Sequence, residues 1–261
     1  MTFAGKIVAV TGAAGGIGQA LCRHFGAAGA RIAAIDRSAG VVDFVAALSG
    51  DGVVAHAAVA DIGDADAVAR AFVDLTQALG PTDILINNAG GSRHRTLAKT
   101  DPAGWRNDVS GNLNGAYHCA HAVLPDMRGR RSGVIVNIGS VNGLAALGDP
   151  AYSAAKAGMI SLTRSLAQEY GRYNIRVNIV LPGTVRTPIW SERVKKDPNV
   201  LKTLERWYPL GRIVEPADIV NAVAFLASDL ANAITGVALP VDCGLNSGNI
   251  VMARELTLED F

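Results

Sequence analysis

The stretch Thr11-Gly-Ala-Ala-Gly-Gly-Ile-Gly18 follows a short apolar run and precedes an amphipathic segment. Strand, glycine-rich turn and helix in this order are typical of a site for the pyrophosphate of a dinucleotide. Gly12 permits a sharp turn, Gly16 allows the backbone to approach the phosphates, and Gly18 allows the helix to pack on the strand. Free N–H groups at the helix start would hold the anion, aided by the helix dipole. A glycine-rich turn that binds nothing remains the alternative at this point.

Apolar runs and amphipathic segments alternate along the rest of the chain. Strands are predicted at 6–11, 31–36, 53–59, 83–87, 133–139, 175–181 and 236–241. Helices are predicted near 16–28, 40–49, 64–79, 102–128, 151–171 and 215–228. Runs such as Ile84-Leu-Ile86 are apolar on both faces, which favours strands covered by helices on both sides. The pattern predicts one α/β domain over 1–261, a Rossmann-type doubly wound parallel sheet of about seven strands. The least regular stretch, about 184–213, is expected to be a lid or substrate insert.

Composition narrows the class of protein further. The chain has 261 residues, of which 49% are hydrophobic, so one large core can form. A net charge of +1 argues against a nucleic-acid partner held by charge. Cys22, Cys119 and Cys243 are odd in number and lack metal-ligand spacing, which favours reduced thiols and no metal site. With no signal peptide and no apolar run long enough to span a membrane, we expect a cytoplasmic protein without a membrane partner.

Asp36 ends the second predicted strand, about 20 residues after the glycine turn. A carboxylate at this place accepts hydrogen bonds from the ribose hydroxyls of NAD and repels the 2′-phosphate of NADP. The neighbouring Arg37 could instead pair with that phosphate. Because the carboxylate lies at the strand tip, we expect Asp36 to dominate and NAD to be the cofactor, with NADP less favoured. An Asp that only caps the next helix is the alternative.

Tyr152 and Lys156 lie four residues apart in the stretch 150–158, so on a helix they share one face. An ammonium beside a phenol favours the phenolate and is expected to lower the pKa of Tyr152 from about 10. Tyr152 would then exchange a proton near neutral pH. The pair alone is a weak signal, and it gains weight from the glycine turn that precedes it.

At these residues the chain resembles the short-chain dehydrogenase/reductase family of single-domain type, over residues 3 to about 248. The matching motifs are Thr11-Gly-x-x-x-Gly-x-Gly18, Asp61-Ile62, Asn87-Asn-Ala-Gly90, Asn112, Ser140, the pair Tyr152 and Lys156, and Pro182-Gly-Thr-Val-Arg-Thr187. The resemblance implies a cofactor site formed by Gly12, Gly16, Ile17, Gly18, Asp36, Arg37, Asp61, Ile62, Asn88, Ala89, Gly90, Tyr152, Lys156, Pro182, Gly183, Val185 and Thr187.

The same resemblance implies hydride transfer between nicotinamide and a carbinol or carbonyl carbon. Tyr152 exchanges the hydroxyl proton, and Lys156 lowers the pKa of Tyr152 and binds the nicotinamide ribose. Ser140 orients the substrate oxygen, and Asn112 holds a water that links Lys156 to solvent. Each role suits the chemistry of its side chain: a tunable acid, a cation, a neutral donor and an amide.

Two positions depart from the family pattern. Ser140 precedes Tyr152 by 12 residues, where many relatives have one residue more. The loop between them is therefore shorter, and the wall of the active site is expected to differ in shape. Cys243 stands where the family usually has glycine. If the backbone there needs a positive φ, Cys243 would be strained.

The sequence also predicts residues that contact the substrate. Ser140, Tyr152, Asn142 and His94 are the predicted substrate-binding residues, His94 because the stretch Arg93-His-Arg95 should border the substrate mouth. That stretch could receive a carboxylate or several hydroxyls, or it could be a solvated loop. Further along, Trp190, Trp207 and Tyr208 either wall the pocket or pack the lid.

These residues predict an NAD-dependent dehydrogenase that acts on a secondary alcohol. Polar neighbours such as Ser92, His94 and Asn142 favour a polyol, a sugar or a cyclic hydroxy compound as the small-molecule substrate. A reductase of 3-oxoacyl thioesters is the alternative enzyme, and a non-catalytic NAD-sensing protein is the alternative of another class. The family resemblance also implies a homotetramer, with the helices near 102–128 and 151–171 at one interface.

Overall fold

Seven parallel strands form a sheet in the computed structural model, which describes residues 1–92 and 95–260. They are β1 (Ile7–Thr11), β2 (Arg31–Asp36), β3 (Ala55–Val59), β4 (Ile84–Asn87), β5 (Gly133–Ile138), β6 (Ile175–Pro182) and β7 (Ala238–Val241). Their order is β3-β2-β1-β4-β5-β6-β7, so the sheet grows outward from β1 in both directions. The strand order reverses between β1 and β4, where such sheets open a crevice at the carboxyl ends. The predicted doubly wound sheet is confirmed.

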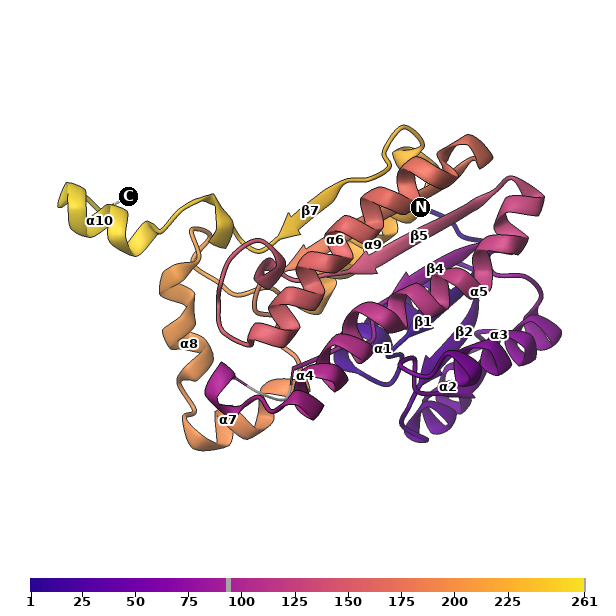
Figure 1. Ribbon diagram of the computed structural model, residues 1–261, viewed down its shortest axis with the longest axis horizontal. Coiled ribbons are helices and arrows are strands. Elements are labelled where there is room, and N and C mark those ends of the chain that lie inside the picture. The colour runs from indigo at the N-terminus through magenta and orange to yellow at the C-terminus, as the bar shows by residue number, and fades with distance from the viewer. Residues whose placement is uncertain (93–94, 261) are drawn as a thin grey trace.

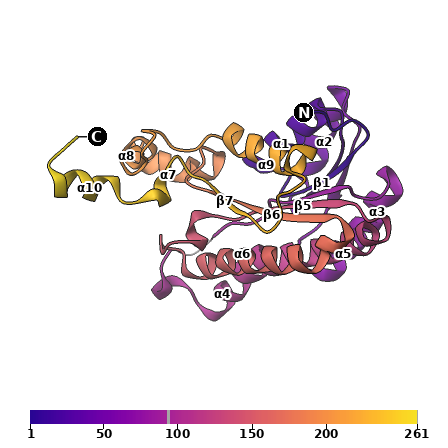
Figure 2. The same cartoon turned by 90° about the horizontal axis from the view of Figure 1, so that it is seen from above.

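Helices cover both faces of this sheet, as Figure 2 shows. On one face lie α1 (Gly16–Ala27), α2 (Gly40–Gly50) and α9 (Pro216–Ala227). On the other face lie α3 (Ala65–Leu79), α5 (Gly115–Arg130) and α6 (Pro150–Tyr170), with α4 (Pro102–Val109) beside α6. No helix in the described part of the chain is both long and apolar enough to cross a membrane.

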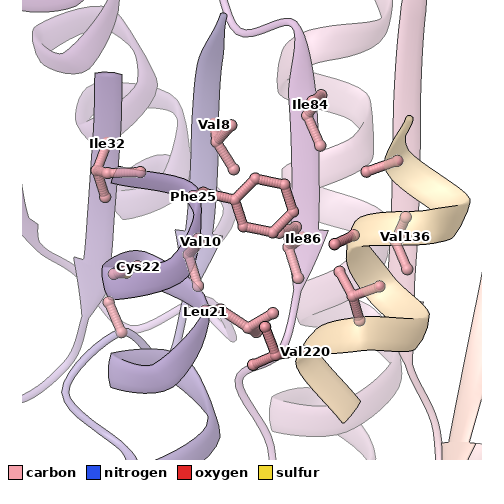
Figure 3. Packing of buried hydrophobic residues seen from close by; sticks show 14 of the residues in the cluster. Val8, Val10, Leu21, Cys22, Phe25, Ile32, Ile84, Ile86, Val136 and Val220 are labelled. Carbon is pink, nitrogen blue, oxygen red and sulfur yellow. The ribbon is translucent and has the colours of Figure 1, made fainter. Parts of the chain in front are cut away.

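Apolar side chains from both faces of the strands form the core. Val8 and Val10 of β1 are fully buried on the side of α1 and α9, where they meet Leu21, Phe25 and Val220 (Figure 3). The alternate residues of the same strand, Ile7 and Ala9, join a second buried cluster on the opposite face. Burial of each large aliphatic or aromatic side chain contributes about 1.5–3 kcal/mol. Burial on both faces explains why the sequences of the strands are nearly continuous runs of apolar residues.

The helix predicted at 102–128 is interrupted in the structure. Between α4 and α5 lies one turn of π-helix, Ser110–Asn114, which contains the buried Asn112. Such turns insert an extra residue into the helical ladder and often occur at functional sites. A hydrophobic pattern with helical period continues through the insertion, so the sequence did not reveal it.

The stretch 184–213 is more regular than expected. It contains two short helices, α7 (Ser191–Lys196) and α8 (Val200–Leu204), together with 3₁₀ turns. Both lie beyond the carboxyl ends of the strands (Figure 1). The last helix, α10 (Ile250–Thr257), projects from the same end of the molecule.

Three apolar residues of the two helices expected at a subunit interface face the core of their own chain. Val123 of α5 and Leu166 of α6 are buried in the second cluster, and Leu162 packs against it. These side chains therefore cover the sheet.

Cys243 has a φ of 52°, and Gly244 beside it has a φ of 89°. The turn after β7 thus needs two consecutive left-handed residues, and only the second is glycine. The left-handed region costs a residue with a Cβ roughly 1–2 kcal/mol. The strain that was expected if the backbone here required a positive φ is present.

Replacement of Cys243 by glycine should relieve this strain, and replacement by alanine should not. Both changes remove the partly buried thiol, so their difference isolates the backbone effect. After the entropic cost of glycine, roughly 0.5–1 kcal/mol, Cys243→Gly should be more stable than Cys243→Ala by about 0.5–1 kcal/mol. Urea unfolding of the two variants measures this difference, and equal midpoints would show that the turn stores no strain.

Candidate active site

The carboxyl ends of the strands open into two adjoining cavities. The turn cavity, about 570 Å³, is lined by the glycine turn after β1 and by Asp36. The tyrosine cavity, about 760 Å³, is lined by Ser140, Tyr152 and Lys156. The two share part of their lining, namely Ile17, Asn88, Gly90, Gly91, Ser92, Thr187 and Ile189. A ligand with two ends can therefore extend from one cavity into the other.

The glycine turn has the geometry that a pyrophosphate needs. A Cβ on Gly18 would overlap the carbonyl oxygen of Gly12, so this close packing of helix on strand requires glycine. Gly12 has a φ of 65°, and a Cβ there would lie 2.8 Å from the Cα of Ala89. Helix α1 begins at Gly16 without a side-chain cap or an acidic residue in its first turn. Its first N–H groups and the positive end of its dipole therefore face the cavity and fit a dinucleotide phosphate.

Asp36 is held rigidly at the edge of the turn cavity. Its Oδ2 accepts a hydrogen bond from the N–H of Ala14 at 3.0 Å, and its Oδ1 accepts one from Ser38 at 2.9 Å. Each carboxylate oxygen keeps a second lone pair for a ligand hydroxyl. Arg37 also lines the cavity, but its side chain is exposed. The carboxylate of Asp36 is thus bonded to the turn itself, whereas the Arg37 side chain is exposed to solvent.

The other predicted cofactor residues divide between the two cavities. Asp61, Ile62 and Ala89 line the turn cavity, whereas Pro182, Gly183 and Val185 line the tyrosine cavity; Ile17, Asn88, Gly90 and Thr187 line both. The residues that the resemblance implied for the cofactor therefore lie along one cleft. Gly18 does not line the cleft, and it allows α1 to pack closely on the turn.

Tyr152 and Ser140 meet across the tyrosine cavity. Tyr152 lies in the first turn of α6, and Ser140 follows the end of β5. A hydrogen bond from Ser140 acts on the Tyr152 phenol. The 12-residue spacing therefore still brings the two hydroxyls together, and the shorter loop does not separate them.

Lys156 lies one turn further along α6 and is fully enclosed. Its Nζ donates to the carbonyl oxygen of Ile138 at 2.8 Å and lies 5.5 Å from the centre of the Tyr152 ring. Burial removes water from the ammonium and lowers the pKa of Lys156 to about 7.

The expected direction of the Tyr152 pKa is wrong for this structure. Burial disfavours the phenolate and raises the pKa of Tyr152 above its usual value; the hydrogen bond from Ser140 opposes this, and the carboxylate of Asp149 adds to it. Lys156 does not offset the burial, because its own pKa is near 7 and its Nζ faces Ile138. Proximity along the helix predicted an attraction, but loss of hydration is the larger effect on both groups.

Asn112 connects the helix that carries it to the loop after β4. Its Oδ1 accepts from the N–H of Gly91 at 3.0 Å, and its Nδ2 donates to the carbonyls of Gly91 at 2.8 Å and Asp108 at 2.7 Å. A Cβ on Gly90 would overlap Oδ1 of Asn112 and would lie 3.2 Å from Nζ of Lys156. Asn112 and Lys156 thus approach the same point of the chain.

Asn142 is placed beside Ser140 as predicted for a residue near the substrate. The Ser140 hydroxyl donates to Oδ1 of Asn142 at 3.3 Å, and the Asn142 amide donates to Ser153 at 3.1 Å. His94 lies outside the described residues. Trp190, Trp207 and Tyr208 line the tyrosine cavity and also pack together in the 184–213 segment, so both interpretations hold.

Sequence reasoning missed two charged residues of the tyrosine cavity, Asp149 and Arg193. Asp149 immediately precedes α6 and has a φ of 49°, which no local pattern indicates. Arg193 lies in α7, three residues after Trp190, and its guanidinium stacks on the Trp190 ring. A spacing of three residues on a helical segment could have predicted this contact.

Comparison with known proteins places this site in a family. A family model described as enoyl-(acyl carrier protein) reductase, of the short-chain dehydrogenase/reductase type, matches residues 12–246. A crystal structure of a short-chain dehydrogenase/reductase family oxidoreductase from Burkholderia thailandensis superposes with a TM-score of 0.91 at 50% identity, covering 98% of each chain.

Two curated relatives extend the comparison. An uncharacterized oxidoreductase of Schizosaccharomyces pombe is 44% identical over 100% of this chain and 98% of its own. Galactitol 2-dehydrogenase (L-tagatose-forming) of Cereibacter sphaeroides is 38% identical over 92% and 94%. The model match, the fold and the similarity over nearly the whole chain agree, and the family uses nicotinamide cofactors. The chain belongs to the short-chain dehydrogenase/reductase family of oxidoreductases.

Proposed function

We propose that the protein is an NAD-dependent oxidoreductase that transfers a hydride between a secondary alcohol and nicotinamide. The observation that carries this proposal is the meeting of Tyr152, Ser140 and Lys156 in a cavity that adjoins the glycine turn. When bound, the oxidised nicotinamide supplies the hydride acceptor and a positive charge that favours the phenolate of Tyr152.

Tyr152 acts as general base for the substrate hydroxyl and returns the proton in the reverse reaction. Ser140 holds the substrate oxygen next to the phenol: the backbone N–H of Asn142 keeps the serine oxygen in place, and the one hydroxyl hydrogen turns from Oδ1 of Asn142 to the substrate oxygen. Lys156 supports the phenolate whenever it is protonated, which its pKa near 7 permits at neutral pH. The role of Lys156 is therefore electrostatic and depends on pH.

Asn112 has a positioning role and contributes to a proton path. Its amide fixes the loop at Gly91, and its Oδ1 keeps a free lone pair near Gly90. Lys156 Nζ lies at the same place, so a water between the two would link the lysine to solvent.

NAD is proposed over NADP because of the fixed carboxylate of Asp36. Its two oxygens are anchored by backbone N–H groups and cannot turn away from a ribose phosphate. A 2′-phosphate would therefore lie against a carboxylate held in place.

A polyol, a sugar or a cyclic hydroxy compound is the proposed substrate class. Hydroxyl and amide groups of Ser92, Ser140 and Asn142 line the cavity and can bind further substrate hydroxyls. Two relatives support this class by their names: galactitol 2-dehydrogenase, and the cis-4-hydroxycyclohexanecarboxylate dehydrogenase of Sinomonas cyclohexanicum, 37% identical.

Reduction of a 3-oxoacyl thioester is the second candidate. The 3-oxoacyl-[acyl-carrier-protein] reductase of Pseudomonas aeruginosa is 38% identical to this chain, and a Brucella melitensis structure of that name holds NAD. Asp36 counts against this candidate, because biosynthetic reductases usually draw on NADPH. A non-catalytic NAD-binding protein is less favoured, because Tyr152, Lys156 and Ser140 are all present in one cavity.

The proposed reaction is tested by NADH absorbance at 340 nm with cyclohexane-1,2-diol, galactitol, other polyols and 3-hydroxyacyl thioesters. Turnover of one class with NAD⁺ is expected. Tyr152→Phe should lower kcat by at least about 10²-fold, because the proton acceptor is lost. Tyr117→Phe, on an exposed tyrosine of α5, is the matched control. Near-full turnover by Tyr152→Phe would contradict the mechanism.

Cofactor choice should depend on Asp36. Asp36→Ala removes two ribose contacts and the charge that repels a phosphate, so kcat/KM for NAD⁺ should fall about tenfold or more, and that for NADP⁺ should rise. Asp43→Ala, an exposed aspartate of α2, controls for a general change of charge. A wild type that already prefers NADP⁺ would show that Arg37 outweighs the carboxylate.

Titration of Lys156 should make the free energy of unfolding depend on pH. Its pKa is about 7 when folded and 10.5 when unfolded, so between these values the unfolded chain binds more protons. Stability of the protein without ligands should therefore rise from pH 7 to pH 9 relative to Lys156→Met, in which this titration is absent. Denaturant unfolding at pH 7, 8 and 9 measures the difference, and parallel curves would contradict the buried, neutral lysine.

A further inference from the structure

The rim of the tyrosine cavity carries a set of charges that the proposed reaction does not use. Arg95, Arg193 and Asp149 all line the cavity together with the catalytic residues. Two guanidinium groups against one carboxylate leave one positive charge in excess. Neither general base catalysis nor the binding of a neutral polyol requires a cation at this position.

The carboxylate of Asp149 already has partners within the protein. Asp149 accepts a hydrogen bond from the Ser92 hydroxyl at 2.9 Å, and it forms an ion pair with Nη1 of Arg95 at 3.1 Å. Its side chain is 18% exposed and does not cap α6, although it stands directly before that helix. A strained backbone with φ of 49° holds it there, three residues before Tyr152.

Arg193 is contributed by a different segment of the chain, α7. Its guanidinium stacks on the ring of Trp190, with Cζ 4.2 Å from the ring centre. Stacking leaves the N–H edge of a guanidinium available for a ligand. Within the described ranges, 1–92 and 95–260, Arg193 forms no ion pair, and the charges that act on it are those of Arg95 and Asp149. Partial burial and the charge of Arg95 both lower the pKa of Arg193, so an additional anion between the arginines would be favourable.

We propose that the substrate of this enzyme carries a carboxylate, which binds to Arg193 on the side facing Arg95, while its hydroxyl lies at Ser140 and Tyr152. The inference rests on the proposed function, since it places a second group of the same substrate. A planar guanidinium fork matches a carboxylate, and the excess of one positive charge matches a single negative charge better than a dianionic phosphate. Within the proposed class of polyols, sugars and cyclic hydroxy compounds, the site selects those that also carry an acid group.

The test compares molecules that differ only in this charge. Cyclohexanecarboxylate and cyclohexanecarboxamide are titrated calorimetrically into the protein saturated with NADH. In parallel, 3-hydroxycyclohexanecarboxylate and 3-hydroxycyclohexanecarboxamide are assayed with NAD⁺. The acid should bind about tenfold more tightly and have a kcat/KM about tenfold higher than the amide, mostly through KM, because the charge lies away from the reacting carbon.

Variants assign the effect to one residue. Arg193→Gln should reduce the acid-to-amide ratio toward one, and Arg193→Lys should retain part of it. Lys196→Gln removes a positive charge from an exposed residue of the same helix and should keep the wild-type ratio.

The outcomes separate this inference from the proposed function. Equal binding of acid and amide by the wild type, or a ratio unchanged in Arg193→Gln, would overturn the carboxylate site. Turnover of neutral alcohols would leave the oxidoreductase proposal intact in that case. Tight binding of the acid without turnover of any alcohol would support the site and count against the proposed reaction.

Discussion

The absence of a side chain at Gly12 is the constraint on which the rest of the site depends. It allows the turn after β1 to lie against the chain after β4. A Cβ on Gly12 would stand only 2.8 Å from the Cα of Ala89. Thr11 and Asn88 then tie the two strand ends together: the Thr11 hydroxyl accepts from the N–H groups of Asn88 and Ala89, and the Asn88 amide donates to the carbonyls of Thr11 and Gly12. The same loop continues to Gly90, where Asn112 and Lys156 converge. Close backbone contact at the glycine turn therefore sets the geometry at the Tyr152 end of the cleft.

Burial governs the chemistry of that catalytic end. The protein removes water from both Tyr152 and Lys156, so each charged form is disfavoured: the pKa of the phenol rises and that of the ammonium falls. A new charge near these two groups shifts their pKa values strongly, because the low dielectric around them screens it little. The positive charge of an oxidised nicotinamide bound beside Tyr152 would act in this low dielectric, which would couple cofactor binding to the basicity of the phenol.

Much of this could be predicted from the sequence, and the failures have physical causes. Strands buried on both faces appear as apolar runs, and residues fixed by a motif, such as Gly12, Ser140 and Tyr152, appear at definite spacings. The π-helical turn around Asn112 was not predictable, because hydrophobic periodicity passes through it. The direction of the Tyr152 pKa depends on how completely the fold excludes water, and no spacing contains that information. The left-handed backbone at Cys243, by contrast, could be predicted, because Cys243 replaces a glycine in a recognisable motif.

The substrate side was least predictable because it is assembled from segments far apart in the chain. Arg95 follows β4, Asp149 precedes α6 and Arg193 belongs to α7, so their proximity is a property of the fold alone. Asp149 connects this side to the chemistry: its carboxylate contributes to the raised pKa of Tyr152, and the ion pair with Arg95 weakens that contribution. A substrate anion on Arg193 would compete with Asp149 for positive charge. With a substrate anion bound there, recognition of the substrate and the basicity of Tyr152 would be linked through one aspartate.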